Sequence, residues 1–323
     1  MEMAAEKASV CVTGGGGFVA SWLIKFLLSK NYFVHATVRR PGDAKYAHLS
    51  AFEKASENLR LFKADLLDYD SIRSAVEGCI GVFHVACPVP SLSETILNPK
   101  VEVIEPAVKG TQNVLKASVE AKVKRFVFVS SIAAVFMNPS WPKDQVMDET
   151  CWSDTEYFRT AKNWYCLSKT EAESKALEFA KGSELHVVSI CPTLVLGPIL
   201  QSTVNTSSLY LMRLLKEGLE SVENRLLWIV DVRDLAEALI LAFEKPEAEG
   251  RYVCMSHMIK TESLLDMLKS KYPHYNYPKN FTEAQEELRL SSDKLQRLGW
   301  SYRPSKDTLI DGVESYRQAG LLD

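Results

Sequence analysis

Short apolar runs alternate with longer amphipathic segments over the first 190 residues of the chain. The runs predict strands, and the segments between them carry apolar residues at helical spacing. The predicted strands are 9–13, 33–38, 59–62, 81–85, 125–130 and 185–190, and the clearest helices are 18–28, 101–121 and 165–178. We expect Pro192 to end the sixth strand. This alternation indicates an α/β protein with a doubly wound parallel sheet and right-handed crossovers.

The pattern becomes less regular after Pro192. Helices are predicted at 206–217, 232–244, 262–271, 293–298 and 308–319, and short strands at 226–230 and 252–255. These pieces are too irregular to continue the sheet alone. We therefore expect a Rossmann-type domain over 1–192 and a smaller mixed α/β lobe over 193–323, with at least one segment that returns to the main sheet. Such a lobe would cover the carboxyl ends of the strands, where ligands bind in open α/β sheets.

Composition and charge narrow the class of protein. A length of 323 residues suits one or two closely joined domains, and a formal charge of −3 gives no reason to expect nucleic acid or an anionic membrane as partner. The apolar runs are far shorter than the roughly 20 residues that cross a bilayer. Seven scattered cysteines form neither a disulfide framework nor a zinc pattern, and the histidines show no ligand spacing. We expect a cytoplasmic protein without a metal, a monomer or weak dimer that acts on a small molecule.

A glycine-rich turn joins the first predicted strand to the first helix. Gly14, Gly17 and Ala20 have the Gly-x-x-Gly-x-x-Ala spacing of a dinucleotide turn, although such turns also occur as structural corners. Small residues allow the tight turn and let the backbone approach a pyrophosphate, which the N–H groups at the helix start can bind. The candidates for cofactor binding here are Thr13, Gly14, Gly16, Gly17, Phe18 and Val19.

Basic residues after the second predicted strand favour NADPH over NADH. Arg39 and Arg40 stand where an NAD site places an acid, and Lys45 follows closely. Guanidinium and ammonium groups suit a 2′-phosphate, whereas a solvated basic loop is the alternative. The remaining cofactor candidates follow the third, fourth and sixth strands: Asp65 and Leu66, Val85 and Ala86, and Pro192, Thr193 and Val195.

Tyr165 and Lys169 form a Tyr-x-x-x-Lys pair on one face of a predicted helix. Tyrosine has an ordinary pKa of about 10, and the charge of Lys169 is expected to lower it. Ser131 ends the preceding strand and can donate a second hydrogen bond to a substrate oxygen. In this scheme Tyr165 protonates the alkoxide that forms on hydride transfer, help worth on the order of 10²–10⁴-fold. Any exposed helix could carry such a pair by chance.

These motifs together resemble the extended short-chain dehydrogenases/reductases, and within them the plant cinnamoyl-CoA reductase and dihydroflavonol reductase group. The similar stretches are 13–22, 110–113, 129–131, 148–154 and 162–169, the last reading Lys-Asn-Trp-Tyr-Cys-Leu-Ser-Lys. The resemblance implies Ser131, Tyr165 and Lys169 as a catalytic triad and Arg39 and Lys45 on the 2′-phosphate. It also implies an aromatic-lined pocket for a phenylpropanoid.

Three departures from the group bear on the substrate. Leu167-Ser168 is closer to the related aldehyde and dihydroflavonol reductases, and Tyr210 and Arg213 stand where thioester reductases have a His-x-x-Lys motif for CoA. Phe158 replaces a cysteine that could pair with Cys166, so that disulfide is excluded. We expect a free aromatic aldehyde, such as a hydroxycinnamaldehyde reduced to its alcohol. Hydroxycinnamoyl-CoA is the close alternative.

The pocket for this substrate should be lined by residues after the fourth to sixth strands and by the smaller lobe. The candidates are Pro88, Ile132, Phe136, Trp164, Tyr210 and Arg213, several of which could equally be core. Two other classes stay open. A nucleotide-sugar epimerase or dehydratase would retain NAD(H), which Arg39 and Arg40 disfavour. A redox-sensing binding protein would typically lack the tyrosine or lysine, and both are present.

Overall fold

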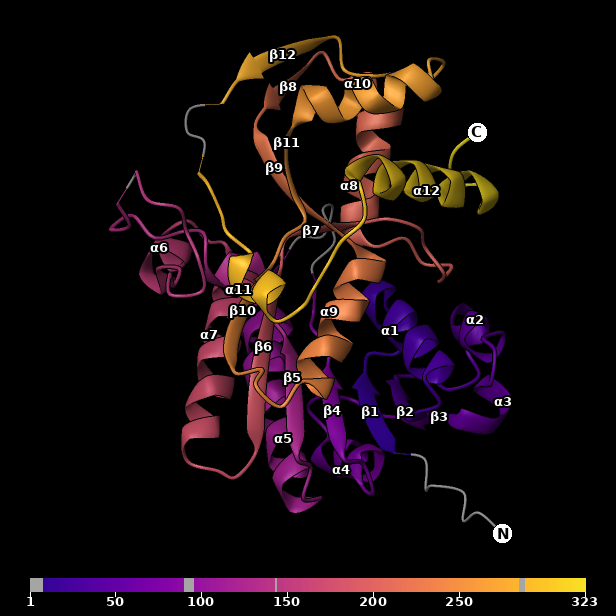
Figure 1. Cartoon of the computed structure of the whole chain (residues 1–323), viewed down its shortest axis with the longest axis vertical. Helices are drawn as coiled ribbons and strands as arrows, with labels where there is room; N and C mark the ends of the chain where they lie inside the picture. Colours follow the sequence, from indigo (N-terminus) through magenta and orange to yellow (C-terminus); the bar gives the residue numbers. More distant parts are fainter. Residues whose placement is uncertain (1–7, 90–95, 143, 285–287) are drawn as a thin grey trace.

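A seven-stranded parallel sheet forms the centre of the molecule (Figure 1). The computed structural model describes residues 8–89, 96–142, 144–284 and 288–323. The strand order is β10-β6-β5-β4-β1-β2-β3. The strands are β1 (Ser9–Thr13), β2 (Phe33–Val38), β3 (Leu59–Lys63), β4 (Gly81–His84), β5 (Arg125–Val129), β6 (His186–Pro192) and β10 (Gly250–Cys254). The predicted doubly wound α/β sheet is confirmed.

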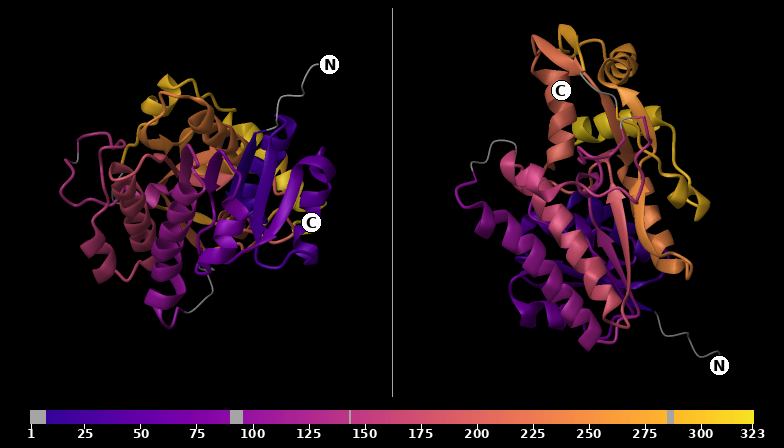
Figure 2. Two further views of the ribbon diagram at one scale, coloured as in Figure 1. Left: turned by 90° about the horizontal axis from the view of Figure 1, so that it is seen from below. Right: turned by 90° about the vertical axis from the view of Figure 1, so that its left-hand side faces the viewer.

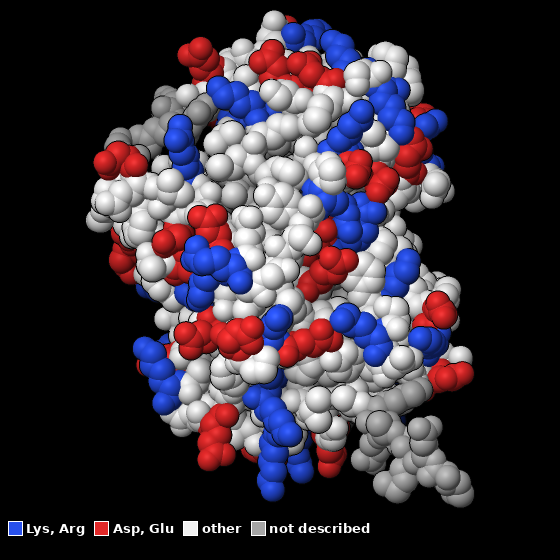
Figure 3. Space-filling view, in the orientation of Figure 1, with Lys and Arg blue, Asp and Glu red and all other residues white. Residues whose placement is uncertain are grey.

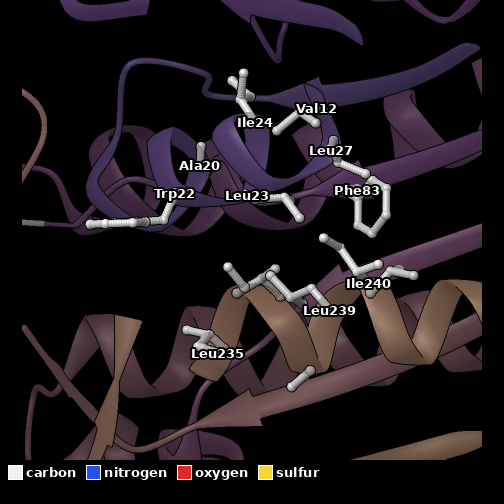
Figure 4. Packing of buried hydrophobic residues seen from close by; sticks show 14 of the residues in the cluster. Val12, Ala20, Trp22, Leu23, Ile24, Leu27, Phe83, Leu235, Leu239 and Ile240 are labelled. Atoms are coloured by element: carbon white, nitrogen blue, oxygen red, sulfur yellow. The ribbon is translucent and has the colours of Figure 1, made fainter. Parts of the chain in front are cut away.

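Helices cover both faces of this sheet (Figure 2). On one face lie α1 (Phe18–Ser29) and α9 (Val232–Glu244), whose Leu23 and Leu239 pack with Phe83 (Figure 4). On the other lie α4 (Tyr69–Val76), α5 (Glu105–Glu120) and α7 (Trp164–Lys181), and a π-helical turn, η2 (Lys100–Ile104), leads into α5. Both faces are therefore apolar, which explains why the strands read as continuous apolar runs.

Residues beyond 192 form a second packed region and also rejoin the main sheet. Strands β7 (Leu194–Leu196), β9 (Leu226–Asp231) and β11 (His257–Lys260) make a small sheet, and β8 (Ser221–Asn224) pairs with β12 (Asn280–Glu283). Helices α8 (Thr206–Lys216), α10 (Thr261–Lys271) and α12 (Ser305–Gln318) share an apolar core with β9. In Figure 1 these elements lie above the carboxyl ends of the main strands. Between them, α9 and β10 belong to the central layers.

Several short elements were not predicted from the sequence. They are η1 (Ala44–Tyr46), α2 (Ala47–Ser50), α3 (Ala55–Asn58), η3 (Ile132–Ala134) and α6 (Thr155–Thr160), while α11 (Asp293–Arg297) matches a prediction. Pro192 is the last residue of β6 and pairs with Cys254 of β10. The β5 pairing already ends at Ile190, so the missing N–H of Pro192 leaves no ladder bond unmade.

Acidic and basic side chains are interspersed over the face of the molecule in Figure 3. No single-sign field of the kind that attracts nucleic acid is visible on this face. Among the described residues, no helix combines the length and hydropathy that crossing a membrane requires. Within the same residues, no three His, Cys, Asp or Glu side chains gather in a way that could hold a metal ion.

Candidate active site

The glycine-rich turn lies between β1 and α1 and leaves no room for larger residues. Gly14 has a φ of 71°, and a Cβ on it would lie 3.0 Å from Ala86. A Cβ on Gly16 would come within 2.2 Å of the Tyr46 ring. Gly15 N–H donates to the Thr37 carbonyl at 2.8 Å, which ties the turn to β2. The turn therefore presents bare backbone at the carboxyl end of the sheet, as a pyrophosphate requires.

Helix α1 begins directly after this turn with an open N-terminus. Gly17 is the N-cap in an extended conformation, and within the described residues no side chain caps the helix or places an acid in its first turn. Phe18 and Val19 are the first helical residues, and only Phe18 is fully buried. Their N–H groups and the positive end of the helix dipole are therefore available to a phosphate. These residues fit a dinucleotide.

Thr13 shapes the loop after β4 through its hydroxyl. The oxygen accepts hydrogen bonds from Val85 N–H at 3.1 Å and Ala86 N–H at 3.0 Å. Its own hydrogen must then go to His84 Nδ1, 2.8 Å away, so the His84 proton lies on Nε2 and points at Thr111. Thr13, Val85 and Ala86, all predicted to bind the cofactor, are therefore hydrogen-bonded to one another. They can pack against a cofactor, but these groups are not free to donate hydrogen bonds to it.

The basic residues predicted to bind a 2′-phosphate lie beyond the carboxyl end of β2. Arg39 and Arg40 are both exposed. Lys45 lies over the Tyr46 ring at 5.0 Å and 3.6 Å from Asp43. Such an exposed ion pair contributes little, so Lys45 stays available to an anionic ligand.

Asp65 and Leu66 follow the neighbouring strand β3. Asp65 is exposed, and its carboxylate accepts a hydrogen bond from Leu67 N–H at 2.9 Å. Asn113 donates to the Leu66 carbonyl at 2.8 Å. A Cβ on Gly110 would come within 2.8 Å of the Leu66 side chain, so α5 is packed closely against this loop.

The three candidate catalytic residues come from the end of β5 and from α7. Ser131 directly follows Ser130 beyond β5 and accepts a hydrogen bond from Ala133 N–H at 3.1 Å. Asn163 caps α7 through its side chain, which places Tyr165 in the first turn of this helix. Lys169 is buried one turn later, and its ammonium donates to the Val129 carbonyl at 2.7 Å. The fold thus brings the group together.

The pKa of Tyr165 is shifted in the direction opposite to the one predicted. Burial raises the pKa above its ordinary value and nearby Cys87 adds to this, while a hydrogen bond with Ser131 opposes it. The prediction that Lys169 would lower this pKa is wrong, because removal from water dominates and the ammonium is bonded to the Val129 carbonyl. The phenol is therefore protonated at neutral pH, as a proton donor must be.

Phe136 links Tyr165 to an aromatic cluster that the sequence analysis did not identify. Its side chain packs in one cluster with Trp164 and Tyr165 and in a second with Ile132, Trp141 and Trp228. The rings of Phe136 and Trp228 meet edge to face at 5.9 Å. Neither buried indole N–H, of Trp141 or of Trp228, has a hydrogen-bond partner in the described part of the chain. Since buried donors are nearly always hydrogen-bonded, these two N–H groups are candidates for bonding a ligand.

One signal in the sequence could have identified Trp228 as a candidate for ligand contact. In β9 the neighbouring Leu227 and Ile229 point into the core of the C-terminal region. Side chains alternate along a strand, so Trp228 faces the opposite side. A large aromatic in the outward phase of a strand is a candidate for ligand contact.

The other pocket candidates occupy different surroundings. Pro88 lies next to Cys87, whose thiol contacts the Pro88 carbonyl at 3.6 Å. Tyr210 packs against the core of the C-terminal region, with the Arg225 guanidinium 5.7 Å from its ring. Arg213, one turn later on α8, is exposed and donates to Glu217 at 2.8 Å. The structure therefore gives Tyr210 and Arg213 partners within the C-terminal region.

The segment from β6 to β7 lies beside β10. Thr193 donates to the Cys254 carbonyl from both its N–H, at 3.1 Å, and its hydroxyl, at 3.3 Å. Val195 accepts a hydrogen bond from Ser207 at 2.6 Å. Pro192 and Thr193 are buried at the carboxyl end of β6, level with the end of β5.

Phe158 is almost fully buried and packs in one cluster with Cys166. It therefore fills the space in which a cysteine would have stood. All seven cysteines carry free thiols.

Known proteins share this architecture over nearly the whole chain. Cinnamoyl-CoA reductase 1 of Petunia hybrida is 44% identical over 317 residues, which cover 97% of this chain and 93% of the petunia protein. The structure of vestitone reductase from alfalfa (Medicago sativa L.) superposes with a TM-score of 0.84 at 33% identity and covers 98% of this chain and 100% of that one. Gre2 from Candida albicans, in complex with NADPH, gives 0.83 at 27% identity, with 97% and 99% covered.

The matching family model extends from the first strand of the main sheet to the last. It is the model of the NAD dependent epimerase/dehydratase family, and it matches residues 10–254. This range contains the turn at Gly14, the Ser131–Tyr165–Lys169 group and β10. The resemblance read from the sequence is confirmed, and the chain belongs to the NAD dependent epimerase/dehydratase family, the extended short-chain dehydrogenases/reductases.

Proposed function

We propose that this protein reduces the carbonyl group of an aromatic aldehyde, such as a hydroxycinnamaldehyde, to the alcohol with NADPH. The observation that carries the proposal is the grouping of Ser131 at the end of β5 with Tyr165 and Lys169 on the first turns of α7, where the buried Lys169 ammonium donates to the Val129 carbonyl at 2.7 Å. A proton donor is needed where an alkoxide forms, and the Tyr165 phenol, on the same helix as Lys169, can supply that proton.

The chain is an oxidoreductase, and NADP(H) is its cofactor. Exposed Arg39 and Lys45 beyond β2 suit the 2′-phosphate, and the NADPH complex of the similar Gre2 supports this choice. The open N-terminus of α1 suits the pyrophosphate. Asp65 is exposed at the end of the neighbouring β3, where its carboxylate can accept a hydrogen bond from the adenine amino group.

The bound cofactor supplies the hydride, and residues of this chain supply the rest of the chemistry. Ser131 donates a hydrogen bond to the carbonyl oxygen and orients it. Tyr165 transfers its phenolic proton to that oxygen as negative charge develops. Lys169 is anchored on Val129 and holds a positive charge near the forming anion. Tyr165 is half-buried, so its surroundings limit the access of water to the transfer.

Tyr210 favours the free aldehyde over the CoA thioester. The matching motif of thioester reductases has a histidine here that helps to hold CoA, whereas Tyr210 packs into the C-terminal core. Arg213 keeps a cation and is paired with Glu217 on its own helix. The thioester stays the second candidate because cinnamoyl-CoA reductases are among the similar proteins, one of them 44% identical. An exposed ion pair can be displaced at little cost, so the choice needs a direct measurement.

The aromatic cluster around Phe136 supports a flat ring as the other end of the substrate. Phe136, Trp228 and Trp141 provide apolar walls, and the two indole N–H donors have no partner among the residues that the structure describes. The oxygen substituents on the phenyl ring of a hydroxycinnamaldehyde can accept hydrogen bonds from such donors. We include Ile132 and Trp164 in the same wall because both pack against Phe136.

A cytoplasmic location and a monomeric or weakly dimeric state are part of the proposal. Seven free thiols support the first, since cytosolic thiols are kept reduced.

The decisive experiment follows NADPH oxidation with coniferaldehyde and feruloyl-CoA in parallel, with NADH as the control. Faster turnover of the aldehyde supports the proposal. Faster turnover of the thioester would make the second candidate correct. Activity with neither would contradict both, and tightly bound NAD after purification would point to an epimerase or dehydratase instead.

A further inference from the structure

We infer that a buried ion pair, Glu173 with Arg251, is the positioning device that holds Ser131 opposite Tyr165. This inference rests on the proposed function, because it concerns the same Ser131 and Tyr165. The two charged residues lie 78 positions apart in the sequence, on α7 and β10. Glu173 is completely buried and Arg251 is 6% exposed. Neither touches the reacting atoms, so each acts through other residues.

All five N–H groups of the Arg251 guanidinium are used. Two of them donate to the Glu173 carboxylate, at 2.9 and 3.2 Å. The other three donate to backbone carbonyls: those of Glu149 at 2.9 Å, Cys151 at 2.8 Å and Ala134 at 3.0 Å. Only the rigid fork of arginine can meet a carboxylate and three carbonyls at once.

The Glu173 carboxylate accepts hydrogen bonds from a hydroxyl at the end of β5 and from one in the middle of β6. It accepts from Ser130 at 2.8 Å and from Ser189 at 2.6 Å. Glu173 lies one helical turn after Lys169, whose ammonium donates to the Val129 carbonyl. Two successive turns of the catalytic helix are thereby bonded to successive residues at the end of β5.

The ion pair therefore holds the segment around Ser131 by hydrogen bonds on both sides. Ser130, on one side, is bonded to Glu173, and Ala134, on the other, is bonded to Arg251. Between them lies the short helix η3 (Ile132–Ala134), which Ser131 caps. The same carboxylate belongs to the helix that carries Tyr165. The ion pair thus ties the Ser131 segment to the helix that carries Tyr165, next to the hydrogen bond from Lys169 to Val129.

This arrangement also gives a role to the stretch 148–154, which resembles the reductase group but has no place in the chemistry. The Glu149 carboxylate accepts a hydrogen bond from Val253 N–H at 2.8 Å, so it returns to β10. The Trp152 ring stacks on the Arg251 guanidinium at 3.6 Å. Ser153 accepts from Met137 N–H at 3.0 Å and donates its own N–H to the Ala134 carbonyl at 3.1 Å. The stretch 148–154 therefore completes the contacts around Arg251, and it supports the segment that contains Phe136.

A buried ion pair is a poor device for stability alone. Taking both charges out of water costs about as much as their attraction returns, and apolar replacements are often as stable. The pair does give one fixed geometry when all its hydrogen-bonding groups are matched, as they are here. Positioning is therefore the role that the geometry supports.

The test replaces Arg251 by Lys, which keeps the charge but has three donors and no planar fork. We expect this variant to bind NADPH within about twofold of the natural chain, because no Arg251 contact reaches the turn at Gly14. Its kcat should fall by about 10- to 100-fold, as expected for misplacement of a catalytic group. Arg125→Lys is the matched control, since Arg125 also donates to backbone carbonyls, of Ala242 and Pro246, but at the opposite end of β5. That variant should keep its kcat.

Two further readouts separate positioning from a general structural role. If Arg251 acts through Ser131, the loss in kcat from Arg251→Lys should nearly vanish in a Ser131→Ala background. Hydrogen exchange should rise in peptides covering 131–137 and not in those covering the turn at 13–19, a measurement that needs no activity. Should Arg251→Lys fold poorly, the neutral pair Glu173→Gln/Arg251→Met offers the same comparison.

The possible failures can be told apart. A natural chain that reduces no carbonyl contradicts the proposed function, while the exchange measurement still decides on the ion pair. Additive losses with Ser131→Ala, an unchanged kcat in Arg251→Lys, or unchanged exchange over 131–137 would overturn the positioning role.

Discussion

In the main sheet, successive residues of each strand point into opposite apolar layers, whereas the C-terminal region adds to its own apolar core a cluster of charges at the end of β9. Phe126 and Val127, for example, belong to different hydrophobic clusters on the two faces. In the C-terminal region Asp231 is completely buried, and it accepts hydrogen bonds from Arg233 at 2.8 and 2.9 Å and from Arg303 at 2.9 Å. Burial of β5 is thus non-directional, whereas the end of β9 is fixed by directional pairs as well.

This difference has a functional consequence. A continuous apolar sheet tolerates change in its loops, while its strand ends stay fixed as a platform for the turn at Gly14 and for Ser131. The C-terminal region adds a few long-range polar contacts to its apolar core. Variation there can alter the pocket without disturbing the platform. Four predictions follow the contrast, from the largest expected effect to the smallest.

Tyr165→Phe tests the platform where the chemistry takes place. It removes the proton donor but keeps the ring, so we expect kcat to fall by about 10²–10⁴-fold with unchanged NADPH affinity. Stopped-flow reduction of coniferaldehyde and fluorescence titration with NADPH measure the two quantities. Survival of turnover would show that another group delivers the proton.

Asp231→Ala tests the C-terminal region in the same way. It leaves Arg233 and Arg303 without the buried partner that both contact, and we expect a loss of about 3–5 kcal/mol in the free energy of unfolding. Urea titration followed by tryptophan fluorescence gives this value. Asp311→Ala is the control, because its carboxylate also bonds Arg233 but is 46% exposed, and its loss should stay below about 1 kcal/mol. Equal losses would mean that burial of Asp231 is not decisive.

His84 makes the stability of the platform depend on pH. Burial lowers the pKa of His84 to about 3, and the nearby charge of Lys169 adds to this, against an ordinary value of 6.5. The unfolded chain therefore takes up a proton below pH 6.5 that the folded protein refuses. The free energy of unfolding should fall by about 1.4 kcal/mol per pH unit from this residue as pH drops below 6.5.

Unfolding measured at pH 6.5, 5.5 and 4.5 on the natural chain and on His84→Gln isolates this contribution. Glutamine supplies both a donor and an acceptor but does not titrate. The slope should be smaller in the variant by the amount stated. Equal slopes would show that the imidazole is not the group responsible.

The platform could be predicted from the sequence, because its signals are local. Strands such as β1 and β5 are short apolar runs, and the turn at Gly14 and the spacing of Tyr165 and Lys169 each lie within a few residues. The direction of the Tyr165 pKa shift could not be predicted, since it depends on how much water the fold removes. Nor could Glu173 and Arg251, or Phe136 and Trp228, be paired from a single sequence. Each of these contacts joins segments that only the complete fold brings together.

Trp228→Phe is expected to have the smallest effect of the four, because it removes one hydrogen-bond donor from the C-terminal region. The ring that packs on Phe136 is kept and the unpaired N–H is removed. If that N–H binds a ring oxygen, kcat/KM for coniferaldehyde should fall about fivefold relative to cinnamaldehyde, which has no ring oxygens. Trp300→Phe is the matched control, because its indole already donates to the Asp234 carbonyl at 2.9 Å. It should lower stability and leave the ratio of the two substrates unchanged. A constant ratio in Trp228→Phe would assign this tryptophan to packing alone, and the substrate oxygens would have to be sought at Trp141.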